Sequence, residues 1–177
     1  MIMKDNFTLG PNQIEMSKIA NLFKLGKFDI LEKETKKLIQ RYPADANLHN
    51  ILGVSLNGQG KFKNSIDIYK KAIILNSNLH LAHFNLGNAY KQTLSLKNAE
   101  SCYKKCLEIK NDYIDAYVGL GLILLDLHKL EESISIFKKA LKIDPENEIL
   151  HRHLSEITKY TQKDAHMDQM EKIISDK

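Results

Sequence analysis

Residues 80–113 read HLAHFNLGNAYKQTLSLKNAESCYKKCLEIKNDY, and this stretch decides the fold. Its apolar residues follow the spacing of amphipathic helices in two blocks, which Gln92-Thr93-Leu94-Ser95 separates. The first block has an apolar stripe through Phe84, Leu86, Ala89 and Tyr90, and the second has one through Leu96, Ala99, Tyr103, Cys106 and Leu107. The stretch therefore predicts a helix, a tight turn and a second, antiparallel helix.

The same pattern recurs along the chain with a constant period of 34 residues. Paired lysines mark this period at Lys36-Lys37, Lys70-Lys71, Lys104-Lys105 and Lys138-Lys139. Three further columns keep the period: Phe28, Phe62, Leu96 and Leu130; Ile39, Ile73, Leu107 and Leu141; and Gly53, Gly87 and Gly121. Since independent columns share one period, the chain is predicted to be an array of helix pairs at about 12–43, 46–77, 80–111 and 114–145.

The segment from His83 to Tyr90, followed by Ala99 and Tyr103, resembles the signature of the tetratricopeptide repeat, W-x2-L-G-x2-Y…A-x3-F. The second repeat matches through Leu52, Gly53, Leu56, Tyr69 and Ala72, and the fourth through Tyr117, Leu120, Gly121, Leu124, Phe137, Ala140 and Pro145. The first repeat departs from the signature, with Ile19 in place of Gly and Leu38 in place of Ala. The resemblance implies an all-α, right-handed superhelical solenoid of four helix pairs with a capping helix.

We expect an N-terminal extension at 1–11, four repeats within 12–147 (about 12–45, 46–79, 80–113 and 114–147) and a capping segment at 148–177. In the capping segment, Ile149, Leu150, Leu154 and Ile157 share one face of a predicted helix. A short tail helix over 164–175 is predicted from Met167, Met170, Ile173 and Ile174. The glycine column is expected where the two helices of a pair press together, so that a Cβ would hold their backbones apart.

The composition is typical of a folded protein, with 43% hydrophobic and 27% charged residues. No apolar run is long enough to span a membrane, and the first residues do not resemble a signal peptide. Two cysteines exclude a disulfide scaffold, which favours a cytoplasmic location. The net charge of +4 does not indicate a nucleic-acid partner, because Arg41 and Arg152 are the only arginines. The lysine column is interpreted as a solvated outer face, with an anionic partner as the alternative.

The residues that could carry chemistry have simpler explanations. His49, His83 and His151 occupy the column in which the family carries an aromatic residue, and Cys106 occupies a column of alanines. Neither His80 with His83 nor Cys102 with Cys106 finds the further ligands that a zinc site needs. Nucleophile-elbow and phosphate-loop motifs are absent from the sequence. We therefore predict no catalytic residue, no metal, no cofactor and no enzymatic activity.

In tetratricopeptide proteins ligands lie along the concave face of the first helices, so the resemblance implies a protein or peptide partner there. The predicted groove residues are Asn50, Val54, Asn57, Phe84, Asn85, Asn88, Lys91, Gln92, Val118, Leu122 and Leu125, with Met16, Ala20 and Phe23 from the first repeat and Asp126 from the fourth. Self-association through the groove or the end faces is a further possibility.

Two known groove types are tested by alignment. The clamp that holds a carboxylate in chaperone-binding members would fall on Met16, Ala20, Ile51, Leu81 and Asn85, or on Asn50, Val54, Asn85, Asp115 and Gly119. Only Asn85 fits, so the clamp is predicted to be absent. In the asparagine ladder of O-linked N-acetylglucosamine transferases, Asn85 would be a single rung between Ile51 and Gly119.

The first helix of the fourth repeat is apolar nearly all round, which predicts a patch of Val118, Leu122 and Leu125 beside Phe84. One explanation is a partner's amphipathic segment, with Asn85, Asn88 and Lys91 at its edge. The other is intramolecular: the capping helix, or the tail helix with Met167 and Met170, covers the patch. The two explanations carry equal weight.

The stretch from His151 to Ser155, with Tyr160-Thr161, Asp164 and residues 166–170, resembles the junction before the sulfotransferase domain of bacterial tetratricopeptide proteins. This resemblance implies an alternative function. The chain would be the recognition or scaffold portion of a larger transferase, a sulfotransferase before a glycosyltransferase, whose catalytic domain lies outside it.

Overall fold

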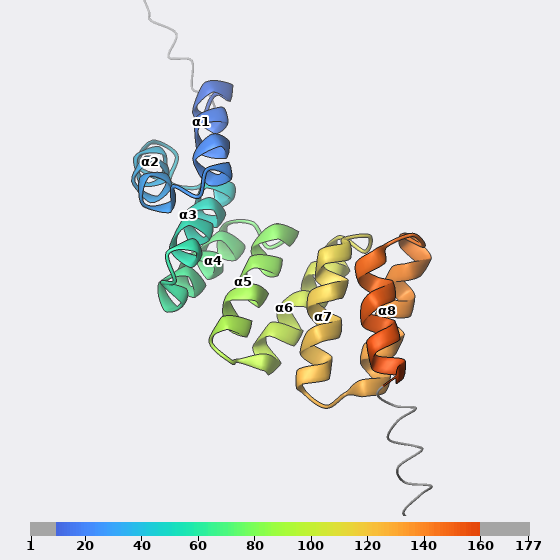
Figure 1. Ribbon diagram of the computed structural model, residues 1–177. Coiled ribbons are helices and arrows are strands. Elements are labelled where there is room, and N and C mark those ends of the chain that lie inside the picture. Colours follow the sequence, from blue (N-terminus) through green and yellow to red (C-terminus); the bar gives the residue numbers. More distant parts are fainter. Residues whose placement is uncertain (1–9, 160–177) are drawn as a thin grey trace, which may run out of the picture. The chain divides into compact units, whose positions relative to one another are not determined.

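The computed structural model describes residues 10–159, and within this range all regular secondary structure is helical. The chain divides into two compact units, unit 1 (Met1–Lys110) and unit 2 (Asn111–Lys177). In each unit, consecutive helices pair with one another through short turns (Figure 1). The predicted all-helical fold of paired helices is therefore confirmed.

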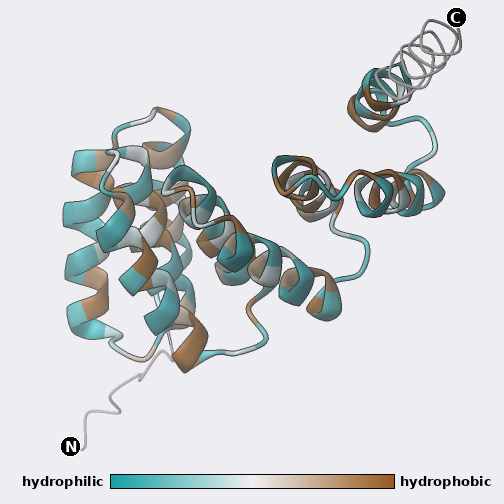
Figure 2. Cartoon of the chain, turned by 90° about the horizontal axis from the view of Figure 1, so that it is seen from below, coloured by the Kyte–Doolittle hydropathy of each residue, from teal (hydrophilic) through white to brown (hydrophobic). Residues whose placement is uncertain are grey.

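Unit 1 contains three helix pairs: α1 (Gln13–Lys24) with α2 (Phe28–Arg41), α3 (Ala46–Gly58) with α4 (Phe62–Leu75), and α5 (His80–Gln92) with α6 (Leu96–Ile109). Unit 2 contains α7 (Ile114–Asp126), α8 (Leu130–Ile143) and a helix over 148–159, here called the cap helix. The helices carry hydrophobic and hydrophilic residues on different sides (Figure 2). The predicted tail helix over 164–175 lies outside the described residues.

Each glycine of the glycine column lies under an aromatic ring of the second helix in its own pair. A Cβ on the glycine would lie only 2.4 Å, 2.8 Å and 2.4 Å from the nearest ring carbon in the pairs Gly53 with Tyr69, Gly87 with Tyr103, and Gly121 with Phe137. All three rings are buried. The glycines were expected to let two helix backbones approach each other closely; in the structure they make room for a buried ring.

The turn inside each helix pair contains one residue with a positive φ angle. These residues recur with the period of the sequence, at Gly26 (64°), Gly60 (74°), Leu94 (57°) and His128 (59°). Glycine adopts this left-handed conformation without steric cost, whereas for other residues it costs about 1–2 kcal/mol. The third and fourth turns are therefore strained at Leu94 and His128.

Leu94→Gly should raise the free energy of unfolding by about 0.5–1 kcal/mol. It removes the left-handed strain, and part of the gain is offset by the larger entropy of glycine in the unfolded chain. Little packing is lost, because Leu94 is 82% exposed. Urea unfolding of the variant beside Leu94→Ala, which keeps the strain, checks this; equal stability of the two variants would contradict it.

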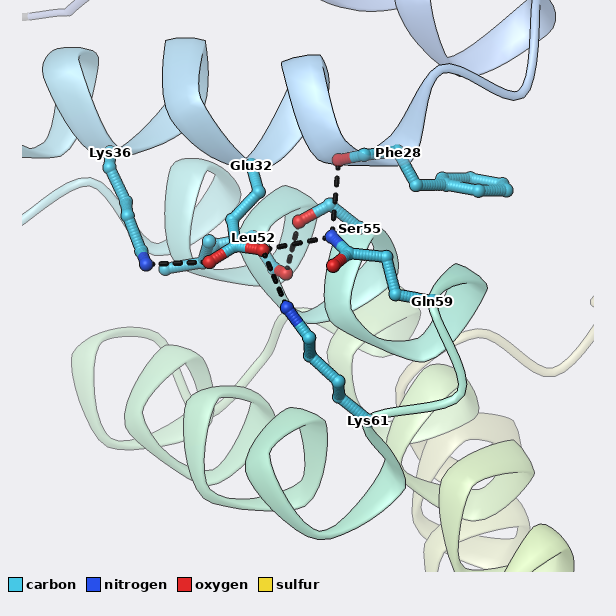
Figure 3. Close-up of polar contacts among 7 residues, drawn as sticks. All are labelled: Phe28, Glu32, Lys36, Leu52, Ser55, Gln59 and Lys61. Carbon is cyan, nitrogen blue, oxygen red and sulfur yellow. Dashed lines mark hydrogen bonds and ion pairs between the residues drawn. The ribbon is translucent and has the colours of Figure 1, made fainter.

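A polar network joins the first helix pair to the second (Figure 3). Gln59, which follows α3, donates from Nε2 to the backbone oxygen of Phe28 at 3.2 Å and to Oε2 of Glu32 at 2.9 Å. Lys36 and Lys61 also donate to the Glu32 carboxylate, at 2.6 Å and 3.3 Å. The hydrogen bond from Lys36, followed by that from Gln59, lowers the pKa of Glu32 to about 2. The network therefore stabilises unit 1 when Glu32 is ionised.

Glu32→Gln should cost about 1 kcal/mol at neutral pH, a value kept small because the ion pairs are near the surface. A carboxylate with a lowered pKa contributes its stability above the unfolded value of 4.5 and loses it as the pH falls towards about 2. The difference in stability between the parent and the variant should shrink over that window. Denaturant unfolding across this pH range tests it, with Glu146→Gln in an exposed turn as the control. A difference that is independent of pH would contradict the prediction.

Candidate functional site

The first helices α1 and α3 line an apolar hollow of about 220 Å³, here called the α1–α3 pocket. Its lining residues are Met16, Ile19, Ala20, Phe23, Ile51 and Val54. Four of these, Met16, Ala20, Phe23 and Val54, are residues that the sequence analysis placed in the groove. Ile19 and Ile51 were not among them. The pocket has no charged lining residue, so it suits an apolar side chain.

A pair of asparagines connects α3 to α5, which are the first helices of the second and third helix pairs. Nδ2 of Asn85 on α5 donates to Oδ1 of Asn50 on α3 at 3.0 Å. Asn50 is buried, with 7% exposure, whereas Asn85 is partly exposed. From the sequence, an asparagine ladder would have had Asn85 as its single rung; in the structure the amide of Asn85 is bonded to a second asparagine of the predicted groove.

Two other predicted groove residues on α5 cover a buried tyrosine. Oδ1 of Asn88 accepts the hydroxyl proton of Tyr103 at 2.6 Å, and the rings of Phe84 and Tyr103 are 5.9 Å apart at 51°. Burial raises the pKa of Tyr103, so the hydroxyl keeps its proton. Phe84 and Asn88 therefore contribute to the packing of their own helix pair. Each is still partly exposed.

The three remaining polar candidates in unit 1 differ in their surroundings. Asn57 on α3 is partly buried, and its Oδ1 is a buried acceptor without a hydrogen-bond partner. Lys91 is partly exposed and Gln92 is exposed, both in the last turn of α5. Of the three, Gln92 is the most exposed.

Unit 2 contains a larger pocket of about 560 Å³. Leu122 and Leu125 line it together with residues of the α7–α8 turn, of the start of α8 and of the cap helix: His128, Leu130, His153, Glu156 and Ile157. Val118, Leu122 and Leu125 are partly buried and pack against a core of Phe137, Ala140, Leu150 and Ile157. The cap helix thus lies against the predicted patch, although the pocket between them stays open. Phe84 belongs to unit 1.

Four of the six paired lysines of unit 1 form ion pairs with glutamates. Among the paired lysines, Lys36, Lys37, Lys104 and Lys105 make ion pairs of 2.6 to 2.8 Å, with Glu32, Glu34, Glu100 and Glu108 respectively. Such exposed pairs contribute little stability, but they neutralise charge. An anionic partner of the lysine column would therefore meet a surface of unit 1 whose positive charge is partly neutralised by glutamates.

The histidine column has a structural role. Nε2 of His49, His83 and His151 lies 2.8 to 2.9 Å from the backbone oxygen six residues earlier, at Pro43, Ser77 and Pro145. The hydroxyl of Tyr117 donates to Asn111 in the same way, at 3.0 Å. Because a carbonyl only accepts, Nε2 must carry the proton in each case. The column therefore ties α3, α5, α7 and the cap helix to the turns before them.

The described residues offer little for metal or nucleophilic chemistry. Within residues 10–159, no group of three or more His, Cys, Asp or Glu side chains is placed to hold a metal ion. Burial raises the pKa of the Cys102 and Cys106 thiols to about 11 each, which keeps them protonated. No helix in the described range combines the length and the apolar character needed to cross a membrane.

Consecutive antiparallel helix pairs, in which the first helices lie next to one another, define the class of helical-repeat proteins. Two family profiles place the chain more closely: one described as a TPR repeat matches residues 53–93, and one described as a tetratricopeptide repeat matches 81–113 and 114–147. Together they cover more than half of the chain, which belongs to the tetratricopeptide-repeat family. No curated protein matches the sequence significantly.

Solved structures share the fold at low sequence identity. MamA from Desulfovibrio magneticus RS-1, from residue 41 to its end, is 20% identical over 92% of this chain and 91% of that chain, with a TM-score of 0.74. A thermophilic TPR protein from Thermus thermophilus, TTC0263, is 20% identical, covers 79% and 77%, and has a TM-score of 0.68. The first TPR domain of Spaghetti (RPAP3), bound to the HSP90 peptide SRMEEVD, is 24% identical, covers 67% and 96%, and has a TM-score of 0.63. These similarities concern the fold.

Proposed function

We propose that this chain is a non-catalytic scaffold that binds a peptide segment of a protein partner along the first helices of unit 1. The observation that carries the proposal is the α1–α3 pocket. First helices line it, and it leaves the apolar ring of Phe23 52% exposed. Exposed apolar surface of this kind marks sites of protein interaction. Asn50, which precedes Ile51 on α3, and Asn85 on α5 add amide groups to the same set of first helices.

The chemistry of the pocket indicates the kind of peptide. Its lining is uncharged, so the partner contributes an apolar side chain there, and the amides of the first helices suit its backbone. The Spaghetti domain is bound to the peptide SRMEEVD. Aligned on the first three repeats, the positions of the carboxylate clamp hold Met16, Ala20, Ile51, Leu81 and Asn85 here, of which only Asn85 fits. We therefore expect peptides selected for apolar side chains rather than for a terminal carboxylate.

Val54→Asp tests the proposal, because it places a charge in the pocket. Peptides selected by display on the full chain should bind this variant about 30-fold more weakly, as expected for loss of a central apolar contact. Ile74→Asp is the matched control, since Ile74 is 83% exposed on the second helix α4. Titration calorimetry should find its affinity within about twofold of the parent. Equal affinities for the two variants would refute the proposed site.

The alternative, a scaffold portion of a larger transferase, has no observation in its favour. The family match ends at residue 147, before the stretch that carries the sulfotransferase resemblance, and residues 160–170 of that stretch lie outside the described range.

The cytoplasmic location and the groove roles of Val118, Leu122 and Leu125 stay predictions.

A further inference from the structure

The pocket of unit 2 occupies the same place in the repeat as the α1–α3 pocket. Three periods of 34 residues separate α1 from α7, and the same interval separates α3 from the cap helix. Four of the six residues that line the α1–α3 pocket therefore have counterparts that line the pocket of unit 2. The counterparts are Leu122 for Ala20, Leu125 for Phe23, His153 for Ile51, and Glu156 for Val54. The two pockets are one feature of the repeat, formed in two different places along the chain.

The two pockets differ in chemistry on the side of the later helix. Where α3 contributes the apolar Ile51 and Val54, the cap helix contributes His153 and Glu156. Apart from His128, the rest of the lining in unit 2 is apolar: Leu122, Leu125, Leu130 and Ile157. The pocket of unit 2 is also larger, with a volume of about 560 Å³ against about 220 Å³. It therefore combines a wide apolar surface with one carboxylate.

The carboxylate of Glu156 is open to a ligand. The Glu156 side chain is 64% exposed, and within residues 10–159 its only ion pair is with Nδ1 of His153, at 3.6 Å, which is charged only when the imidazole is protonated. Arg152 and Lys159, four residues before Glu156 and three after it, form no ion pair with it in the same range. His153 is held in place because its ring stacks on Phe137, with the centroids 5.5 Å apart. The pocket therefore presents a negative charge that no lysine or arginine in the described part of the chain pairs with.

We propose that the pocket of unit 2 binds a peptide segment in which an apolar residue lies next to a lysine or arginine. The apolar side chain packs against Leu122 and Leu125, and the basic side chain pairs with Glu156. In such pockets the apolar lining supplies contact area, and the few polar groups set the specificity. An acidic segment is rejected, because it would place a like charge beside Glu156. The inference rests on the proposed function, that the chain binds peptides, but it assigns a second site with a different preference from that of the uncharged α1–α3 pocket.

Peptide display on the full chain tests the preference, with Val54→Asp present throughout so that the α1–α3 pocket does not contribute. Peptides selected on this chain should carry lysine or arginine beside an apolar residue. When Glu156→Lys is added, the selected peptides should carry aspartate or glutamate there instead. Glu146→Lys makes the same change of charge in an exposed turn outside the pocket lining, and it should leave the selected pattern unchanged. The same pattern with and without Glu156→Lys would overturn the proposal.

Titration calorimetry of one selected peptide measures the contribution of the charge. Glu156→Lys should weaken its binding about fivefold, as expected when an exposed ion pair is replaced by a repulsion of similar size. The loss should shrink at high ionic strength, because salt screens exposed charges. A peptide whose basic residue is replaced by glutamine should bind the parent and Glu156→Gln with equal affinity. A loss that is independent of both salt and the basic residue would contradict the pairing with Glu156.

The selections also separate this inference from the proposed site in unit 1. Peptides selected on the parent chain should fall into two classes, one that depends on Val54 and one that depends on Glu156. If the Val54→Asp chain selects no peptide while the first class is found, the pocket of unit 2 is closed to peptides, and the inference fails alone. If only the class that depends on Glu156 is found, the inference stands, and the proposed site in the α1–α3 pocket fails.

Discussion

Gly53→Ala is expected to lower the free energy of unfolding by about 1–3 kcal/mol, the range typical of an overpacked core. The new methyl group would lie 2.4 Å from Cε1 of Tyr69. The ring is 1% exposed, so the helix pair has to separate to accept the methyl group. In an ordinary helix interior the same change is favourable by about 1 kcal/mol. Urea unfolding followed by circular dichroism measures the difference.

A double-mutant cycle isolates the cause. Tyr69→Ala alone should be costly, because a large buried side chain is lost. In that background, Gly53→Ala should become neutral or stabilising, since only the helix propensity of alanine remains. If Gly53→Ala costs the same with and without the ring, the contact between glycine and ring does not explain the glycine column.

Leu120→Asp should unfold unit 2, with a cost above about 4 kcal/mol, because it buries an unpaired charge. Leu120 is 1% exposed on α7. Leu122→Asp, two residues further along, should cost only about 1–2 kcal/mol, because its carboxylate can reach solvent in the open pocket of unit 2. Thermal unfolding of the two variants in parallel tests the difference.

The comparison also decides between the two explanations of the apolar patch. If Leu122→Asp unfolds the protein as readily as Leu120→Asp does, Leu122 belongs to the core of unit 2, and a partner does not contact it. If the variant stays folded, its affinity for the display-selected peptides shows whether Leu122 contributes to binding.

The paired-helix fold follows from the sequence because the repeat supplies independent columns with one period. The reason for the glycine column did not follow in the same way. Gly53 and Tyr69 are 16 residues apart, so column comparison places them in two unrelated columns. Only the antiparallel packing of α3 and α4 brings the two residues together. The left-handed turns at Gly26 and Gly60 could be predicted from glycine, whereas Leu94 has no local signal for that conformation.

The site was less predictable than the fold, since it depends on contacts between repeats. Asn85 and Asn50 are 35 residues apart, one more than the period, so the alignment set Asn85 beside Ile51. Ile51 was therefore assigned to a failed clamp, although it lines the α1–α3 pocket. The exposed fraction of α1 also depends on which neighbours it has, and this information is not contained in a single repeat.

The ties from α3, α5, α7 and the cap helix to the turns before them make the repeats exchangeable as blocks. In residues 77–110, the bond from His83 to Ser77 and the contact of Gly87 with Tyr103 both lie inside the block. Copying or removing 34 residues in this register keeps each of these ties and each glycine–ring contact intact within its block, whereas a bond between repeats, such as that of Asn85 with Asn50, has to form anew. A change whose length is not a multiple of 34 residues separates them. A gene for such a chain can therefore grow or shrink by whole blocks, because each added block contains its own hydrogen bond to the preceding turn and its own glycine–ring contact.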